Sequence, residues 1–360
     1  MKVTLATEKL KSVVSKAMKG VGNNSLIPLT SMLGIKKLEN ENFLKFYSTN
    51  GRDTLVCKLD CQTECEPFTI TVSADLFGRL ISKITSEQIS FAVDNGNLFV
   101  GGNGMYKIPI IYDEEGAVDF PEYPNFVAEN DIEFMKNDVL NIIHSNKNSL
   151  AKTMEMPYLT GYYLGEKAIA TDTNVICFND TNLFKGKNVL LSSDTMELLS
   201  ISSEEKLKMK KRGNQILFTA SDIILYTSEL DGKDIYPVED INSYLTLSFP
   251  YKCELPKDLL NSVLDRLSLF IEPYDRNAID FTFTKDKLTI SSKKSSSVED
   301  IRYLGNCDCE TFTCAVDVAM IKDQISSISA DKVDLYFGEE NAIKITSDKV
   351  VNIISLLEEE

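Results

Sequence analysis

Apolar residues at helical spacing mark the first helix that the sequence predicts. The stripe recurs at positions i, i+3, i+4 and i+7 and consists of Leu10, Val13, Val14 and Ala17. This spacing predicts an amphipathic helix with one buried face. A short run at residues 3–7 comes directly before it and predicts a strand that leads into the helix.

The same opening returns twice along the chain. A strand pattern leads into a helical pattern at residues 132–140 and again at residues 253–260. A second strand-to-helix step follows each opening, at residues 72–75, 191–194 and 316–319. Strand patterns then close each copy, at residues 87–100, 205–218 and 331–345.

These landmarks keep their order at a period of about 120 residues, a length typical of one domain. We therefore interpret the chain as three tandem copies of an α+β domain in which two helices pack on antiparallel sheets. The predicted domains are residues 1–126, 127–250 and 251–360.

The composition is that of folded domains, since 43% of the 360 residues are hydrophobic. No stretch approaches the roughly 18 consecutive apolar residues of a membrane span, and the first residues lack the apolar core of a signal peptide. We therefore expect a soluble protein inside the cell.

The chain has eight cysteines, too few at this length for a disulfide scaffold. Two groups leave a metal site open as an alternative: Cys57, Cys61 and Cys65, and Cys307, Cys309 and Cys314. Neither group contains the tight Cys-x-x-Cys pattern of a zinc site. Because alternate residues of an extended strand share a face, we favour half-buried strand residues over a metal centre.

No catalytic constellation is recognisable. The only histidine, His144, falls on the polar side of a predicted helix, and no Gly-x-x-x-x-Gly-Lys-Ser/Thr phosphate loop is present. Acidic runs such as residues 113–115 and 358–360 are typical of solvated loops and tails. Nothing in the sequence requires an enzyme, a cofactor or a metal.

The first helix carries a concentration of positive charge although the formal net charge of the chain is -16. Off its apolar stripe lie Lys9, Lys11, Lys16 and Lys19, and the second predicted helix adds Arg79 and Lys83. A basic helix face on an acidic chain suggests a polyanion such as DNA. A face that is merely solvated remains the alternative.

The copies differ in charge. Residues 1–126 hold 13 Lys and Arg against 15 Asp and Glu, whereas residues 251–360 hold 13 against 21. In the second and third copies, the residues expected to face DNA from the helices are His144, Lys147 and Arg266. If DNA is bound, the first copy should supply most of the attraction.

Several short segments resemble the bacterial DNA polymerase III beta subunit, the sliding clamp family, and the resemblance extends over the whole chain. They are Ile27-Pro28-Leu29-Thr30-Ser31, Asp119-Phe120-Pro121, Tyr158-Leu159-Thr160-Gly161, Ala170-Thr171-Asp172, and residues 225–232 followed by Tyr236-Pro237. The resemblance implies a ring of two head-to-tail chains, with helices inside and sheets outside. Such a ring encircles duplex DNA without reading its sequence, tethers the replicative polymerase and clamp loader, and has no catalytic activity of its own. It also implies the cytoplasm of a bacterium or of a phage-infected bacterium.

The same resemblance implies a hydrophobic pocket for short peptides of partner proteins. Carried over by position, its residues are Leu159, Thr171, Thr173, Asn174, Val175, Ile176, Pro237, Ile241, Asn341, Ala342, Ser355, Leu356 and Leu357. The family commonly has Gly-His-Arg-Leu where this chain has residues 173–176, so the pocket loses its cationic member. We expect its peptide preference to differ from the usual one.

Ring closure, by the same resemblance, would join the first copy of one chain to the third copy of the other. The matching positions are Phe270 and Ile271 against Tyr106, Lys107 and Ile108. For these interface positions the alternative is that Phe270 and Ile271 cap their own core. For the function as a whole, the alternatives are a cysteine-bound metalloprotein and a repeat scaffold that never binds DNA.

Overall fold

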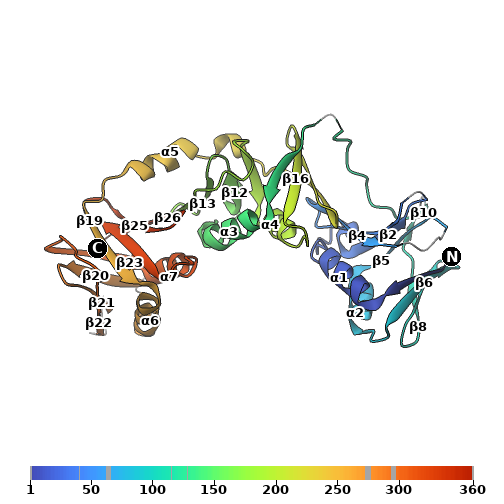
Figure 1. Ribbon diagram of the computed structural model, residues 1–360, viewed down its shortest axis with the longest axis horizontal. Coiled ribbons are helices and arrows are strands. Elements are labelled where there is room, and N and C mark those ends of the chain that lie inside the picture. Colours follow the sequence, from blue (N-terminus) through green and yellow to red (C-terminus); the bar gives the residue numbers. More distant parts are fainter. Residues whose placement is uncertain are drawn as a thin grey trace. The chain divides into compact units, whose positions relative to one another are not determined.

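The computed structural model describes residues 2–39, 41–61, 66–114, 116–127, 129–271, 277–292 and 297–358. The chain divides into two compact units. The first unit consists of Met1–Asn137 and Asp194–Glu229, and the second of Asp138–Ser193 and Leu230–Glu360. Both contain helices packed on antiparallel sheets (Figure 1).

One order of elements occurs three times along the described residues: a strand, a helix, four strands, a helix and three strands. The first copy comprises β1 (Lys2–Ala6), α1 (Thr7–Met18), β2 (Met32–Lys37), β3 (Phe43–Thr49), β4 (Thr54–Asp60), β5 (Phe68–Ser73), α2 (Ala74–Lys83), β6 (Gln88–Asp94), β7 (Asn97–Gly101) and β8 (Met105–Pro109). The second comprises β11 (Ile132–Met135), α3 (Lys136–Asn146), β12 (Gly161–Leu164), β13 (Ala168–Thr171), β14 (Val175–Asn179), β15 (Val189–Ser192), α4 (Ser193–Ser200), β16 (Lys206–Arg212), β17 (Gln215–Thr219) and β18 (Ile223–Ser228). The third comprises β19 (Tyr251–Pro256), α6 (Lys257–Ser268), β20 (Ala278–Thr284), β21 (Lys287–Ser292), β22 (Val298–Arg302), β23 (Thr311–Asp317), α7 (Val318–Ser326), β24 (Lys332–Phe337), β25 (Ala342–Ser347) and β26 (Val350–Ser355).

Shorter elements lie in the connections. They are the two-residue strands β9 (Tyr112–Asp113) and β10 (Gly116–Ala117), the helix α5 (Val238–Ser243), and the 3₁₀ turns at Pro28–Ser31, Lys147–Ser149, Pro157–Thr160, Lys233–Ile235 and Tyr244–Thr246. The threefold repeat that the sequence predicts is therefore confirmed in the order of the elements. The domain boundaries at residues 126/127 and 250/251 stay a prediction, because the two compact units both draw strands from residues 127–250.

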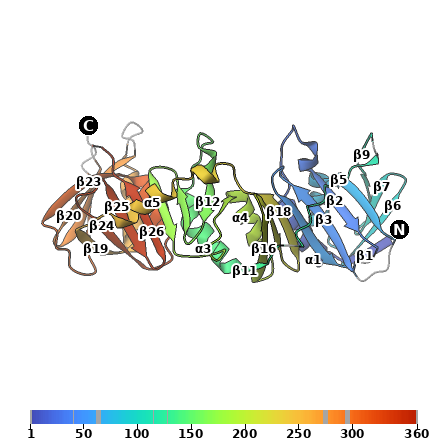
Figure 2. The same cartoon turned by 90° about the horizontal axis from the view of Figure 1, so that it is seen from above.

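The first unit contains a four-stranded sheet, β1-β6-β7-β8, and an eight-stranded sheet, β11-β16-β17-β18-β4-β3-β2-β5. The larger sheet spans two copies because β18 pairs with β4, with Ile223 opposite Cys57 and Tyr226 opposite Thr54. Figure 2 shows β18 beside the strands of the first copy.

The second unit repeats this plan with an eight-stranded sheet, β15-β12-β13-β14-β26-β25-β24-β19, and a four-stranded sheet, β22-β21-β20-β23. Here β26 pairs with β14, with Val175 opposite Ile354. At both junctions the last strand of one copy pairs with a strand of the preceding copy. That partner is the third of the four strands that lie between the two helices of the copy. The strands that would continue this rule, β8 and β22, are each at the edge of a four-stranded sheet.

The predicted apolar stripe of α1 faces the core. Leu10, Val14 and Ala17 are buried and Val13 is partly buried, while α1 packs on β3 and β4 and beside α2. On α2, the Phe77 ring lies 5.9 Å from that of Phe91, centroid to centroid. Burying such side chains supplies most of the stability of helices this short.

The described cysteines of the two groups are buried free thiols. Burial raises the pKa of the Cys57 and Cys314 thiols to about 12, so neither is a thiolate at neutral pH. Cys307 and Cys309 lie in the loop between β22 and β23 rather than in a strand, which corrects that part of the prediction. They still face one side, because Asp308 between them is exposed.

Cys65 lies outside the described residues. Within the described part of the chain, no group of three or more His, Cys, Asp and Glu residues could hold a metal ion. The helices described there include none long and apolar enough to cross a membrane.

Candidate functional site

A groove of about 540 Å³ opens on the second unit, beside α5. Six of the predicted pocket residues line it: Thr173, Asn174, Ile176, Asn341, Ala342 and Ser355. The other six lining residues carry no signal in the sequence that predicts them: Asp240, Ser243, Tyr244, Leu247, Glu340 and Ile353. Residues from four separate parts of the second unit therefore meet at one surface.

The apolar lining of the groove is the outer face of a packed core. Ile176, Ala342 and Ile353 belong to one buried cluster together with the predicted residues Leu159 and Ile241. In the same cluster the rings of Tyr163 and Tyr236 stack with 5.1 Å between centroids. Leu159 and Ile241 thus belong to the core on which the groove residues pack, and they do not line the groove.

A tight turn between β13 and β14 shapes one border. The Asp172 Oδ1 atom accepts hydrogen bonds from the backbone N–H groups of Asn174 (2.9 Å) and Val175 (2.8 Å). Thr171 Oγ1 accepts one from the N–H of Thr173 at 3.1 Å. These bonds hold Thr173 at φ 82°, a left-handed conformation that a β-branched residue rarely adopts. Buried Thr171 therefore positions the turn.

Backbone hydrogen bonds connect this turn to the end of the chain. The N–H of Ser355 donates to the carbonyl of Asn174 at 2.9 Å, and the N–H of Leu356 donates to the carbonyl of Asn341 at 3.1 Å. The border of the groove formed by residues 173–174, 341–342 and 355 is consequently fixed by main-chain contacts.

Four further predicted pocket residues lie elsewhere in the second unit. Val175 belongs to the core of the third copy, and Leu356 packs against that core. Leu357 donates its N–H to the carbonyl of Ala315 at 2.9 Å. Pro237 precedes α5 and is partly buried. The structure does not bring these four side chains to the groove.

The predicted basic residues of the first copy differ in availability. Lys9, Lys19 and Lys83 are exposed and have no ion-pair partner among the described residues. Lys11 lies 3.7 Å from Glu8, and Arg79 pairs with Asp75 one helical turn away. These pairs are on the surface and contribute little to stability.

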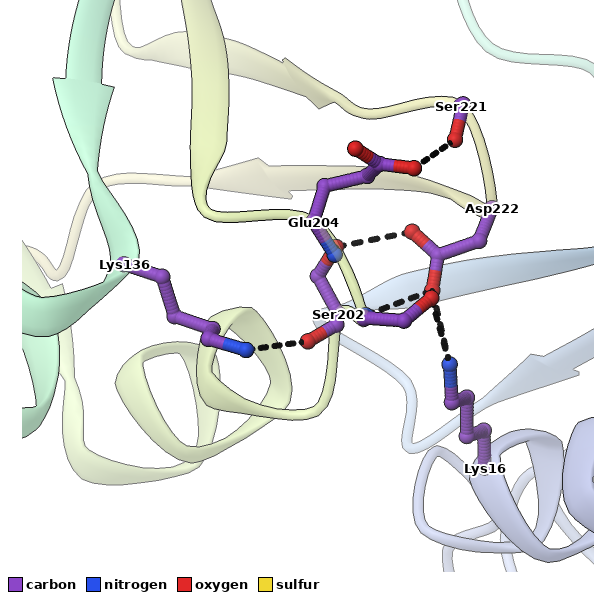
Figure 3. Close-up of polar contacts among 7 residues, drawn as sticks. Lys16, Lys136, Ser202, Glu204, Ser221 and Asp222 are labelled. Carbon is purple, nitrogen blue, oxygen red and sulfur yellow. Dashed lines mark hydrogen bonds and ion pairs between the residues drawn. The ribbon is translucent and has the colours of Figure 1, made fainter.

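Lys16 is engaged within the first unit. Its Nζ atom lies 2.7 Å from Asp222 Oδ2 (Figure 3). The same atom lies 3.2 Å from Ser203 Oγ. Asp222 also accepts hydrogen bonds from the Ser202 hydroxyl (2.7 Å) and from the N–H of Ser203 (2.8 Å). We therefore correct the prediction for Lys16: it connects α1 to the segments before β16 and β18 and is not a free cation.

The pKa of Asp222 is far below its ordinary value. Burial acts to raise it, but the hydrogen bonds from Lys16, Ser203 and Ser202 together outweigh burial. Nearby, Lys136 Nζ donates to the carbonyl of Ser202 at 2.9 Å, and the Ser221 hydroxyl donates to Glu204 (Figure 3). The ionised form of Asp222 is thus the centre of a structural network.

The predicted residues of the later helices are exposed, as with His144 and Lys147. His144 lines a cavity of about 300 Å³ with Asp138, Asn141 and other polar residues. On α6, Arg266 is bound by Glu299, with Nε 2.8 Å from Oε1. Arg266 is therefore already neutralised by a neighbour.

The predicted interface residues lie in two places, on the edge strand β8 and directly after α6. Tyr106, Lys107 and Ile108 are on the edge strand β8, where Ile108 is buried in its own sheet. Phe270 follows α6 and is 50% exposed, whereas Ile271 packs on the core of the third copy. The alternative that the residue caps its own core thus describes Ile271 but not Phe270.

Fold comparison connects these features to known structures. The chain has the fold of the bacterial DNA polymerase sliding clamps over its full length. No protein-family model and no curated protein sequence matches it.

The sliding clamp of Bacillus subtilis superimposes with a TM-score of 0.87 at 17% identity, covering 100% of both chains. The beta subunit of Streptococcus pyogenes gives 0.88 at 16% identity, again over 100% of both chains. The DNA polymerase III beta subunit of Thermotoga maritima gives 0.82 at 14% identity with the same coverage.

Proposed function

We propose that the protein is a DNA sliding clamp, a non-catalytic processivity factor that encircles duplex DNA and tethers a replicative polymerase. The proposal rests on how consecutive copies are joined, with the last strand of one copy paired to a strand of the copy before it. Two junctions within the chain extend a sheet from one copy to the next, and β8 and β22 are the strands at the equivalent positions that have no partner copy in the described part of the chain. A second chain completes both.

In this proposal β8 of one chain adds to β22 of its partner, and the reverse contact closes a ring of six domains. Large apolar side chains support it at both edges: Met105 on β8 is 71% exposed and Val298 on β22 is 55% exposed. Phe270, which follows α6, is a further exposed apolar side chain of the third copy. Exposed edge strands with apolar residues readily pair with another chain. The domains are residues 1–126, 127–250 and 251–360.

The helices of such a ring face the DNA. Exposed Lys9, Lys19 and Lys83 supply loose phosphate contacts, with Lys11, Arg79, His144 and Lys147 as further polar or charged groups. Contacts to phosphate carry no sequence information, so they attract and centre the duplex and leave it free to slide. The ring retains DNA by topology and needs no strong electrostatic grip.

The groove beside α5 serves as the docking site for short peptides of the polymerase, the clamp loader and other replication proteins. Its size, and a lining that combines apolar residues with polar and acidic side chains, suit an extended peptide that offers both apolar anchors and polar groups. The protein then acts in the cytoplasm of a bacterium or of a phage-infected bacterium.

Retention on circular DNA tests the proposal. Dilute, dissociated protein is mixed with nicked plasmid and then concentrated so that rings re-form around the DNA. Gel filtration at about 0.5 M salt removes electrostatic binding. We expect the protein to elute with circular plasmid and to be lost after one restriction cut. Equal retention on linear DNA, or none on circles, contradicts the proposal.

A further inference from the structure

Two carboxylates line the groove beside α5. Asp240 comes from α5, and Glu340 comes from the turn between β24 and β25. The apolar part of the same lining includes Ile176, Ala342 and Ile353. A ligand that covers the apolar lining therefore comes close to acidic groups from two different elements.

Neither carboxylate is neutralised within the protein. Asp240 and Glu340 have no ion-pair partner in the described part of the chain, and none of the groove-lining residues is Lys, Arg or His. The neighbouring cation Lys344 is held over aromatic rings, with its Nζ 5.2 Å from the Phe249 centroid and 5.0 Å from that of Tyr336. The groove consequently presents an uncompensated negative potential.

We propose that the peptides bound in this groove combine apolar anchors with at least one Lys or Arg. The inference rests on the proposed function of the groove as a peptide site. A cationic side chain next to the anchors gains attraction from Asp240 and Glu340, while an acidic one is repelled. The side chains of Asn174 and Asn341 are uncharged, so they do not discriminate between a cationic and an acidic peptide.

The charge of the peptide is isolated with two fluorescent probes that share a leucine-leucine-phenylalanine core. One probe carries three flanking lysines and the other carries three flanking glutamates. Fluorescence anisotropy at about 50 mM salt, where the Debye length exceeds 10 Å, measures both affinities. We expect the lysine probe to bind about 5- to 10-fold more tightly, as expected for two partly exposed charge pairs.

Removing the groove carboxylates checks the cause of the preference. In the Asp240→Asn/Glu340→Gln variant, the two probes should bind within about 2-fold of each other, since only the paired charges differ. The matched control is Glu239→Gln/Glu339→Gln, which removes the same charge one residue away from each groove position. This control should keep most of the preference.

The outcomes separate the inference from the function on which it rests. Equal binding of both probes by the wild-type protein overturns the charge preference and leaves the peptide groove standing. Binding of neither probe overturns the proposed groove itself. Tyr244→Ala removes an exposed apolar wall of the groove and should weaken both probes alike, by about 5-fold. An unchanged affinity would place the probes elsewhere.

Discussion

At the scale of single residues, the position of a charge in the sequence did not reveal whether it is free. Lys16 and Lys9 both lie off the apolar stripe of the same helix, but Lys16 is bound by Asp222, 206 residues away in the chain. Only the tertiary structure brings these two side chains together. The basic face was therefore predictable as a pattern, but its free members were not.

Replacing Asp222 tests the structural role of this pair. Asp222→Asn removes the ion pair with Lys16 and weakens the hydrogen bonds from Ser202 and Ser203. We expect the free energy of unfolding to fall by about 1–3 kcal/mol. The control Asp75→Asn breaks the exposed pair with Arg79 and should cost less than about 0.5 kcal/mol. Urea denaturation measures both, and equal effects would contradict the assignment.

The same pair predicts a pH dependence. Because the pKa of Asp222 is lowered in the folded protein, its stabilising contribution is complete above the unfolded carboxyl value of about 4. The contribution is lost progressively as the pH falls below that value. Asp222→Asn should therefore lose less stability than the wild type between about pH 4 and pH 2. Parallel loss in both proteins, measured by urea midpoint against pH, would count against the prediction.

At the scale of elements, strand and helix patterns were readable from the sequence because each copy repeats them. The groove was only half predictable. The segment from α5 to Leu247, which forms one border of the groove, has no regular spacing of apolar residues. The sequence therefore did not indicate that Asp240 and Tyr244 line the groove. The pairing of β18 with β4 was equally hidden, because strand partners are set by long-range packing.

The exposed residue after α6 tests the free edges. If Phe270 lies in the proposed ring interface, Phe270→Glu should raise the dimer dissociation constant at least about 10-fold, since buried aromatic side chains carry much of the energy of an interface. Because Phe270 is half exposed, the fold should survive. Leu259→Glu, at a similarly exposed position on α6, is the control and should remain dimeric. Sedimentation equilibrium measures both, and a dimeric Phe270→Glu protein would exclude this contact.

The exposed lysines of α1 and its C-terminal end test the proposed DNA-facing surface. Lys9→Glu/Lys19→Glu should weaken binding to linear duplex at low salt and reduce the salt slope of log affinity by about two. The control Lys187→Glu changes a loop before β15 and should have little effect. Fluorescence anisotropy over a salt series measures the slope, and an unaltered slope would place the DNA on another face.

At the scale of the whole molecule, the sequence predicted three copies, and the order of elements confirms them. It could not show that the compact units divide residues 127–250 between them, since that division depends on which sheets merge. If the ring forms, the protein should sediment as a species of about 80 kDa, twice the 40.3 kDa chain. A monomer at micromolar concentration would contradict ring closure.

The edge strands β8 and β22 have a consequence for assembly. A contact that joins the front of one chain to the back of the next is heterologous, and such contacts either close on themselves or propagate into a filament. Nothing in β8 or β22 alone limits the number of chains. A ring closes only if the chain is stiff enough to hold the second β8–β22 contact within reach. Variants that loosen the β18–β4 or β26–β14 pairing should therefore form open polymers as well as monomers.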